Sequence, residues 1–339
     1  MVSNYYTQSI IKIGIHMLIK KSLNTVVKHS YKMAAIACSF ALLGCANTAD
    51  NHTTTLAKAG SPASQFDLLG WTISVPIDSD GNGKSDQIKE KALAAGYSDS
   101  EYFYLANDGG MVFKSPVKGA KTSKNTKYTR SELREMIRRG NTSHNTKGVG
   151  GNNWVFSTAP AADLKNAGAV DGTLEATLAV NHVTTTGVNW QQGRVIIGQI
   201  HANDDEPIRL YYRKLPQHEK GSIYFAHEPN SEADEQWVDI IGNSLPNYWN
   251  QDAAPAEPED GIKLGEKFSY RIEVTGHDLA VTVVRPGKTD ITKHVDMSES
   301  RYDVGGQYMY FKAGVYNQNK TGDAKDYVQA TFYDLKVTH

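Results

Sequence analysis

Short segments of β-branched and aromatic residues recur between turn signals along almost the whole chain from Gln65 onward. We predict strands at residues 71–75, 102–105, 111–114, 154–157, 174–185, 194–202, 208–215, 223–227, 236–241, 268–275, 279–285, 308–317 and 328–337. Few helical segments separate these strands, which excludes an alternating strand–helix layout. Two packed antiparallel sheets satisfy such a pattern, so we predict an all-β fold, a sandwich or jelly roll with one or two short helices.

The clearest helix signal runs from about Asp86 to Ala95, with Ser85 as a plausible N-cap and Gly96 as the stop. We find no internal repeat and predict one domain over residues 65–339 and a monomer. The 339-residue chain carries 36 basic and 37 acidic residues, and this balance argues against a general nucleic-acid binder. Any recognition of an anion must therefore be local.

The N-terminal segment reads as an export signal. Lysines precede an uncharged run from Met33 to Gly44, which is too short for a membrane span. The run ends in Leu42-Leu43-Gly44-Cys45, which resembles a bacterial lipobox and predicts lipidation of Cys45; an ordinary signal peptide is the alternative. We expect residues 1–45 to be the signal and 46–64 a flexible tether. We expect the protein to be held at the outer membrane by this lipid alone, or otherwise to be in the periplasm or outside the cell.

The segment from Tyr310 to Gln318 has two different faces if it forms a strand, because successive side chains point to opposite sides. One face is apolar and suits a core. The other is polar and suits an anionic, ring-shaped ligand; it consists of Tyr310, Lys312, Tyr316 and Gln318, with Gly314 between them as apparent open space.

A second alternating strand places Gln199 and His201 on one face, which puts an amide beside a possible proton acceptor. Taken alone this signal is weak, because a lone histidine in a strand is more often structural.

The segment from Thr129 to Gly140 is ambiguous. Thr129 and Glu132 have capping-box spacing and an apolar stripe follows, so local propensity favours a helix with a solvated charged face. As a strand, the same segment would align Arg130, Glu132 and Arg134 on one face, where guanidinium groups could bind carboxylates.

Residues Asp78 to Asp86 have the beginning of a calcium loop, with acids or amides at positions 1, 3, 5 and 9 and glycine at position 6. Position 12 is Lys89, where an EF-hand needs a bidentate glutamate. An Asx/Gly turn leading into the helix is the simpler interpretation, and we assign no metal to the site.

The order of Arg130-Ser-Glu-Leu-Arg134, Gln199-Ile-His201 and Tyr310-Phe-Lys-Ala-Gly-Val-Tyr-Asn-Gln318 resembles the three signature blocks of alginate lyases of polysaccharide lyase family 7. The resemblance spans roughly Phe66 to His339. It implies a β-jelly roll in which the three blocks are strands lining one cleft. For Arg130 to Arg134 it therefore overrules the helix that local propensity favours.

The resemblance implies cleavage of alginate by β-elimination, in which a proton leaves C5, the 4-O-glycosidic bond breaks and a 4,5-unsaturated sugar forms. Arg130 and Gln199 match positions that neutralise the uronate carboxylate, Tyr316 the acid that protonates the leaving oxygen, and His201 the base. No cofactor is implied. The positions implied to bind substrate, with the glutamate orienting the arginines, are Glu132, Arg134, Tyr310, Lys312 and Gln318.

Isoleucine in Gln199-Ile200-His201 goes with family members that accept guluronate, so we expect activity on guluronate or mixed blocks. Two other functions remain open on the residues alone. A carbohydrate-binding module or adhesin could share the fold, although it needs no proton acceptor opposite a phenol. A glycoside hydrolase would need paired carboxylates, and the three blocks offer only Glu132.

Overall fold

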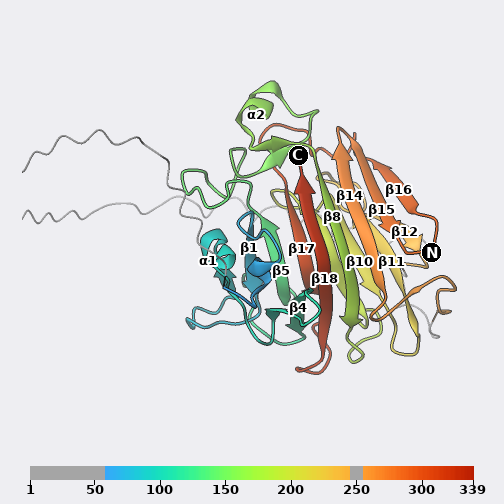
Figure 1. Cartoon of the computed structure of the whole chain (residues 1–339). Coiled ribbons are helices and arrows are strands. Elements are labelled where there is room, and N and C mark those ends of the chain that lie inside the picture. The colour runs from blue at the N-terminus through green and yellow to red at the C-terminus, as the bar shows by residue number, and fades with distance from the viewer. Residues whose placement is uncertain (1–57, 245–254) are drawn as a thin grey trace, which may run out of the picture. The chain divides into compact units, whose positions relative to one another are not determined.

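Two antiparallel sheets packed face to face make up most of the computed structural model, which describes residues 58–244 and 255–339 (Figure 1). This confirms the predicted all-β fold with two layers. The first sheet has nine strands, in the order β12 (Gln236–Ile241), β11 (Lys220–His227), β10 (Ile208–Arg213), β9 (Arg194–His201), β17 (Tyr310–Asn317), β5 (Arg130–Glu135), β1 (Trp71–Val75) and β2 (Asp86–Ile88), with β13 (Ile262–Lys263) paired to β11.

The second sheet covers one face of the first. Its seven strands follow the order β16 (Ile291–Asp296), β15 (Asp278–Val284), β14 (Lys267–Thr275), β8 (Gly172–His182), β18 (Tyr327–Thr338), β4 (Met111–Pro116) and β3 (Phe103–Leu105). The remaining elements are short: β6 (Trp154–Val155) with β7 (Ala169–Val170), and the helices η1 (Pro62–Ser64), α1 (Glu90–Ala94) and α2 (Ala161–Asn166).

The core lies between the sheets and follows from strand alternation. On β17, Phe311, Ala313 and Val315 are fully or almost fully buried and face the second sheet, where Phe113 and Phe332 meet edge to face at 5.1 Å. The opposite side chains of β17 must then point to the outer face of the nine-stranded sheet. We call this outer face of β5, β17 and β9 the site face.

Strand order brings the three sequence blocks side by side, because β17 lies between β9 and β5. Lys312 pairs with Gln199 on one side and Arg134 on the other. Tyr316 pairs with Arg130, and Tyr310 pairs with His201. Segments that are far apart in the sequence therefore share one polar face.

Residues 130–135 form strand β5, as the family resemblance implied and against their local helical signal. Pairing with β1 and β17 on both sides overrides a local capping pattern, because sheet packing outweighs propensity differences of less than about 1 kcal/mol per residue. The expected helix from Asp86 to Ala95 is wrong in its first part. Asp86–Ile88 pair with β1 as strand β2, and only Glu90–Ala94 are helical.

Gly314 is required by the backbone, and our expectation that it leaves open space for a sugar ring is wrong. Its φ is +133°, and a Cβ there would lie 2.6 Å from the Ser131 carbonyl oxygen and 2.9 Å from Cα of Glu132. The register between β17 and β9 shifts at this point, between Ala313 and Tyr316. The glycine permits an irregularity that sets the position of Tyr316.

The predicted signal over residues 1–45, the lipidated Cys45 and residues 46–57 of the predicted tether lie outside the described residues. The last part of that tether packs onto the domain, since Ser61 is 1% exposed and Pro62 begins the 3₁₀ helix η1. Among the described residues, no helix is long and apolar enough to span a membrane.

Candidate active site

Glu132 is the centre of the site face and is 3% exposed. One oxygen accepts a hydrogen bond from Gln199 on β9, and the other lies against Lys312 on β17 and 2.8 Å from Nη1 of Arg130. Burial alone would raise the pKa of Glu132, but Lys312 and Arg130 outweigh it and hold the pKa below its usual range. The carboxylate therefore stays ionised and holds the three side chains together.

This arrangement leaves a net positive charge for a substrate. Two cations share one carboxylate, and burial together with the Arg130 charge lowers the pKa of Lys312. The amide of Gln199 has a second N–H beside the same cluster. Together these groups can neutralise a uronate carboxylate, the step that makes its C5 proton acidic enough to leave.

Tyr316 lies at the Arg130 end of the cluster. The guanidinium carbon of Arg130 is 3.6 Å from the centre of the Tyr316 ring, and Tyr128 meets that ring edge to face at 6.1 Å. Burial raises the pKa of Tyr316, although the charge of Arg130 acts in the opposite direction. At neutral pH Tyr316 is therefore a neutral phenol that can donate a proton.

His201 lies at the other end, where β9 ends. Its ring stacks on Tyr310 at 5.1 Å, and its Nδ1 lies 2.6 Å from the carbonyl oxygen of Ala202. Burial and the positive charge of Lys312 lower the pKa of His201 to about 3. The imidazole is therefore neutral at neutral pH and can accept a proton.

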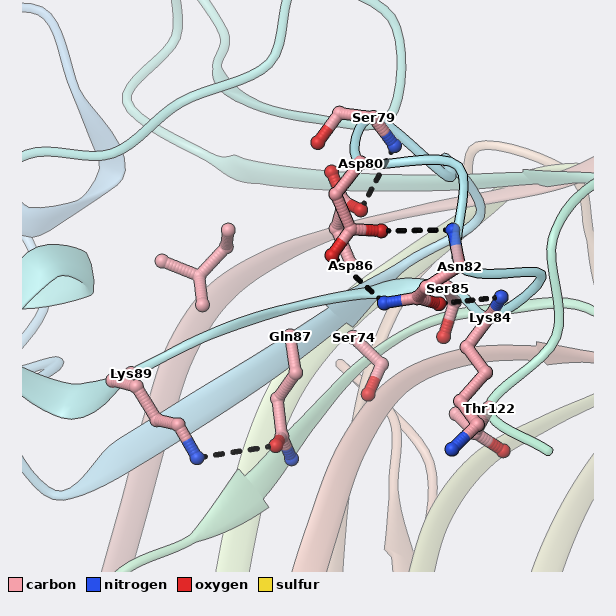
Figure 2. Close-up of a pocket in the computed structure, with 11 residues that line it drawn as sticks. Ser74, Ser79, Asp80, Asn82, Lys84, Ser85, Asp86, Gln87, Lys89 and Thr122 are labelled. Carbon is pink, nitrogen blue, oxygen red and sulfur yellow. Dashed lines mark hydrogen bonds between the residues drawn. The ribbon is translucent and has the colours of Figure 1, made fainter. Parts of the chain in front are cut away.

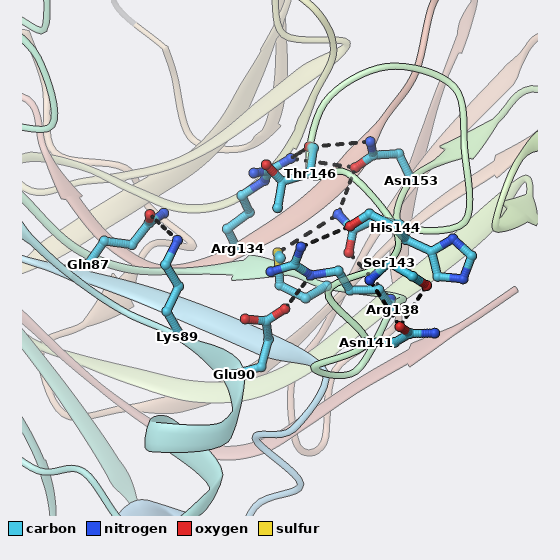
Figure 3. Close-up of polar contacts among 12 residues, drawn as sticks. Gln87, Lys89, Glu90, Arg134, Arg138, Asn141, Ser143, His144, Thr146 and Asn153 are labelled. Carbon is cyan, nitrogen blue, oxygen red and sulfur yellow. Dashed lines mark hydrogen bonds and ion pairs between the residues drawn. The ribbon is translucent and has the colours of Figure 1, made fainter. Parts of the chain in front are cut away.

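Arg134, which we predict to grip a sugar, also contacts other parts of the protein with its guanidinium group. The group lies 4.0 Å over the ring of Tyr310 and donates a 2.5 Å hydrogen bond to the carbonyl oxygen of Thr146 (Figure 3). Asn153 binds the same carbonyl and that of Gly148. Arg134 thus anchors the 141–153 loop beside the site face.

Arg138 holds the other part of this loop. It donates hydrogen bonds to Glu90 at 2.5 Å and to the His144 carbonyl oxygen at 2.9 Å (Figure 3). Gln318, predicted to bind substrate, follows the end of β17, is 7% exposed and donates to the neighbouring Asn317 carbonyl at 3.4 Å. None of the contacts between described residues joins Gln318 to the Glu132 cluster.

The structure also reveals residues that the sequence blocks did not indicate. Tyr211 and Tyr224 stack at 5.0 Å on the same face as Tyr316, with Trp237 beside both rings and Arg194 5.2 Å from the Tyr211 ring. Alternation within Ile208–Arg213 could have placed Tyr211 on this face. Glu206 beside His201 follows β9 in a loop and carries no recognisable motif.

The acidic loop at Asp78 to Asp86 connects β1 to β2 as a hairpin, so the expected turn leads into a strand and not directly into a helix. Carboxylate oxygens of Asp78, Asp80 and Asp86 lie within 4.8 Å of one another. Each acid also accepts a backbone N–H of the loop. Beside them lies a polar pocket of about 510 Å³ that is lined by Ser74, Gln87 and Lys89, among others (Figure 2).

Comparison with known proteins agrees with this geometry. Residues 66–339 match the sequence model of the alginate lyase family. An alginate lyase from Klebsiella pneumoniae is 67% identical over 284 residues, which cover 84% of this chain and 92% of that protein.

Solved structures of alginate lyases are similar as well. A crystal structure of the alginate lyase from Klebsiella pneumoniae has a TM-score of 0.81 at 68% identity, covering 82% of this chain and 98% of that one. An alginate lyase from Pseudomonas aeruginosa has a TM-score of 0.57 at 28% identity, covering 81% and 100%. An exolytic family 7 enzyme from Zobellia galactanivorans, 24% identical with a TM-score of 0.59 and covering 82% and 97%, shares the fold.

Proposed function

The chain belongs to the alginate lyases of polysaccharide lyase family 7, and from this premise we propose a division of labour within its site. The enzyme is a polysaccharide lyase that acts on alginate. In our proposal Arg130, Gln199 and Lys312 neutralise the uronate carboxylate, His201 removes the C5 proton, and Tyr316 protonates the leaving oxygen.

The placement of His201 and Tyr316 at opposite ends of the Glu132 cluster is the observation that carries this proposal: Tyr316 packs against Arg130, and His201 stacks on Tyr310. A neutral imidazole and a neutral phenol at opposite ends of one cationic cluster are the states that a base and an acid need before reaction. In the step itself, the C5–H bond breaks and its proton moves to His201. The electron pair forms the C4–C5 double bond, the C4–O4 bond breaks, and O4 takes the proton of Tyr316.

The same observation supports a preference for guluronate or mixed blocks. In guluronate the C5 proton and the leaving oxygen lie on opposite faces of the sugar, so a base separate from the acid is needed. In mannuronate one tyrosine could serve both roles, but only if it first became a phenolate. The raised pKa of Tyr316 makes that phenolate costly at neutral pH.

Separate digestion of polyguluronate and polymannuronate tests the proposal, with the ultraviolet absorbance of the 4,5-unsaturated uronate as the readout. We expect a faster rise on polyguluronate and on mixed alginate. A faster rise on polymannuronate would refute the preference. Binding of both polymers by folded protein without any absorbance rise would instead favour a carbohydrate-binding module.

We also propose that the protein is exported and anchored by lipid on Cys45, and that it acts as a monomer. The support for export and for the lipid anchor is the order of lysines, uncharged run and Leu42-Leu43-Gly44-Cys45. A Cys45→Ser variant should leave the membrane fraction, while unchanged fractionation would contradict the anchor.

A further inference from the structure

Glu206 is an acid beside the proposed base that the family blocks do not include. It lies in the loop between β9 and β10, and its Oε1 is 3.5 Å from Nε2 of His201. Both side chains are partly covered, with 20% of Glu206 and 23% of His201 exposed. The backbone carbonyl of Glu206 accepts the N–H of Glu228, which ties the loop to the end of β11.

The hydrogen bond of Nδ1 of His201 determines whether Nε2, which faces Glu206, carries a lone pair or a hydrogen. A carbonyl oxygen can only accept, so Nδ1 of His201 carries a hydrogen and donates it to Ala202. In the neutral ring the lone pair is then on Nε2, the nitrogen that faces Glu206. When Nε2 takes a proton, a carboxylate is already at ion-pair distance.

Opposing charges surround the Glu206 carboxyl group. Its Oε2 lies 3.8 Å from Nη1 of Arg209, which Glu228 and Glu235 also contact. Burial raises the pKa of Glu206 to about 7, with Arg209 opposing the rise and Glu228 adding to it. The titratable and charged groups that act on it or feel its charge are His201, Arg209, Tyr211, Glu228, Tyr302, Tyr310, Lys312, Arg130 and Tyr316.

We propose that Glu206 is a positioning residue for the elimination: its carboxylate stabilises the imidazolium form of His201 and then accepts the proton that Nε2 has taken from C5. This proposal rests on the role assigned to His201 under the proposed function. The proton passes from Nε2 to Glu206 and on to water, and the Tyr316 phenolate left by the reaction regains a proton from water. No oxidant or further reactant is needed.

The charge arrangement explains why His201 needs such a partner. The positive charges of Lys312 and Arg130 both disfavour a positive charge on the His201 ring, and this weakens His201 as a base. An ionised Glu206 offsets that repulsion, whereas a protonated Glu206 offers no counter-charge. The benefit of Glu206 should therefore appear only above its own pKa.

The test compares Glu206→Gln with the wild type on polyguluronate between about pH 5.5 and 9. We expect kcat to fall about tenfold at pH 8 with KM nearly unchanged, the equivalent of about one pKa unit of lost charge stabilisation. The ratio of the two rates should approach one below pH 6, where wild-type Glu206 is protonated. A ratio that is constant with pH, or equal to one throughout, would overturn the proposal.

Glu228→Gln is the matched control, because it removes a neighbouring charge that does not contact His201. Without Glu228 the pKa of Glu206 falls. The acid limb of the plot of kcat against pH should therefore move to lower pH, while kcat at the plateau stays the same. A plateau loss equal to that of Glu206→Gln would assign the effect to the Arg209 network and overturn the proposal.

His201→Asn separates this proposal from the proposed function. If His201→Asn is inactive while Glu206→Gln keeps the wild-type profile, only the Glu206 proposal fails. If His201→Asn keeps wild-type activity, His201 is not the base and both fail. Thermal unfolding of each variant shows that the rates refer to folded protein.

Discussion

Strand β5 carries two buried glutamates on opposite faces, and they belong to two different regions. Glu132 faces the site cluster, where its partners are the side chains of Arg130, Gln199 and Lys312. Glu135 faces the seam between the sheets and accepts the N–H of Phe311 at 3.0 Å and the ring of His339 at 2.7 Å.

Both glutamates are buried, so the two regions differ in the groups that these carboxylates contact. Around Glu132 the cations outnumber the acids, which leaves charge for a ligand. Around His339 the second nitrogen binds the Asp171 carbonyl at 2.6 Å, and Trp154 and Phe311 pack against the ring. We call this second region, Glu135 and His339 with the rings around them, the C-terminal clasp. Its glutamate and histidine are hydrogen-bonded within the protein, so we expect it to serve stability.

The largest effect should come from Tyr316→Phe on the site face. The change removes one hydroxyl group that hydrogen-bonds to no side chain among the described residues, so stability should be nearly unchanged. Losing the general acid should lower kcat by about 10³-fold, within the range for such catalysts. Steady-state rates and oligosaccharide binding check this. Tyr128→Phe, the edge-to-face neighbour, should keep most activity, and comparable losses in both variants would contradict the assignment.

Gly314→Ala should affect both activity and stability, because the residue lies between the two regions on β17. A Cβ would strike the β5 backbone in a conformation that L residues rarely adopt, at a cost of about 1–3 kcal/mol in the free energy of unfolding. Displacement of Tyr316 should lower kcat as well.

Gly287→Ala is the control for Gly314→Ala. It has φ of +73° but no atom within 4 Å of its Cβ, so it should cost about 1 kcal/mol and leave kcat unchanged. Equal unfolding temperatures for the two variants would show that the close approach at Gly314 has no energetic consequence.

Comparing strands β1 and β12 with strand β5 shows which elements the sequence alone could predict. Strands β1 and β12 are predicted to the residue, because alternation and turn signals are local properties. The capping pattern in the sequence of β5 favours a helix, but the segment forms a strand because it pairs with strands that are far away in sequence. The strands β2, β7, β13 and β16 and the helix α2 were not predicted, since they are short, or polar and exposed, and depend on their neighbours.

The site shows the same division. The family blocks indicated the residues that the structure gathers around Glu132. They could not show that Lys312 forms an ion pair with Glu132, that Gln199 donates a hydrogen bond to it, or that Arg134 anchors a loop. Glu206 could not be predicted at all. Its position depends on how a loop turns back towards His201, and no spacing in the sequence encodes that turn.

His339→Gln should affect stability alone and in a pH-dependent way. Burial would lower the pKa of His339, but the bond to Glu135 outweighs it and the pKa is raised. Its contribution is then fully present below the unfolded pKa of about 6.5 and is lost as pH rises through the folded value. We expect the free energy of unfolding of the wild type to exceed that of the variant by about 1–2 kcal/mol near pH 6 and by less at pH 9.

Thermal unfolding across this pH range measures the effect, with kcat as the second readout. Unchanged kcat would support the separation of the C-terminal clasp from the site face. A stability difference that grows with pH would contradict the sign, and a loss of kcat at equal stability would join the two regions.

The smallest effect should follow calcium removal. The Asp78–Asp86 hairpin is at the β2 edge of the sheet, its acids already accept backbone hydrogen bonds, and Lys89 occupies the position where a calcium loop needs a glutamate. Chelation should leave kcat on short oligoguluronates unchanged and shift stability by less than about 0.5 kcal/mol. A calcium-dependent rise in unfolding temperature that Asp80→Asn abolishes would reveal a bound ion at this edge. A loss of kcat on chelation would show that the hairpin and the site face act together, because in our proposal Arg130, Lys312 and Gln199 stabilise the charge that develops in the elimination.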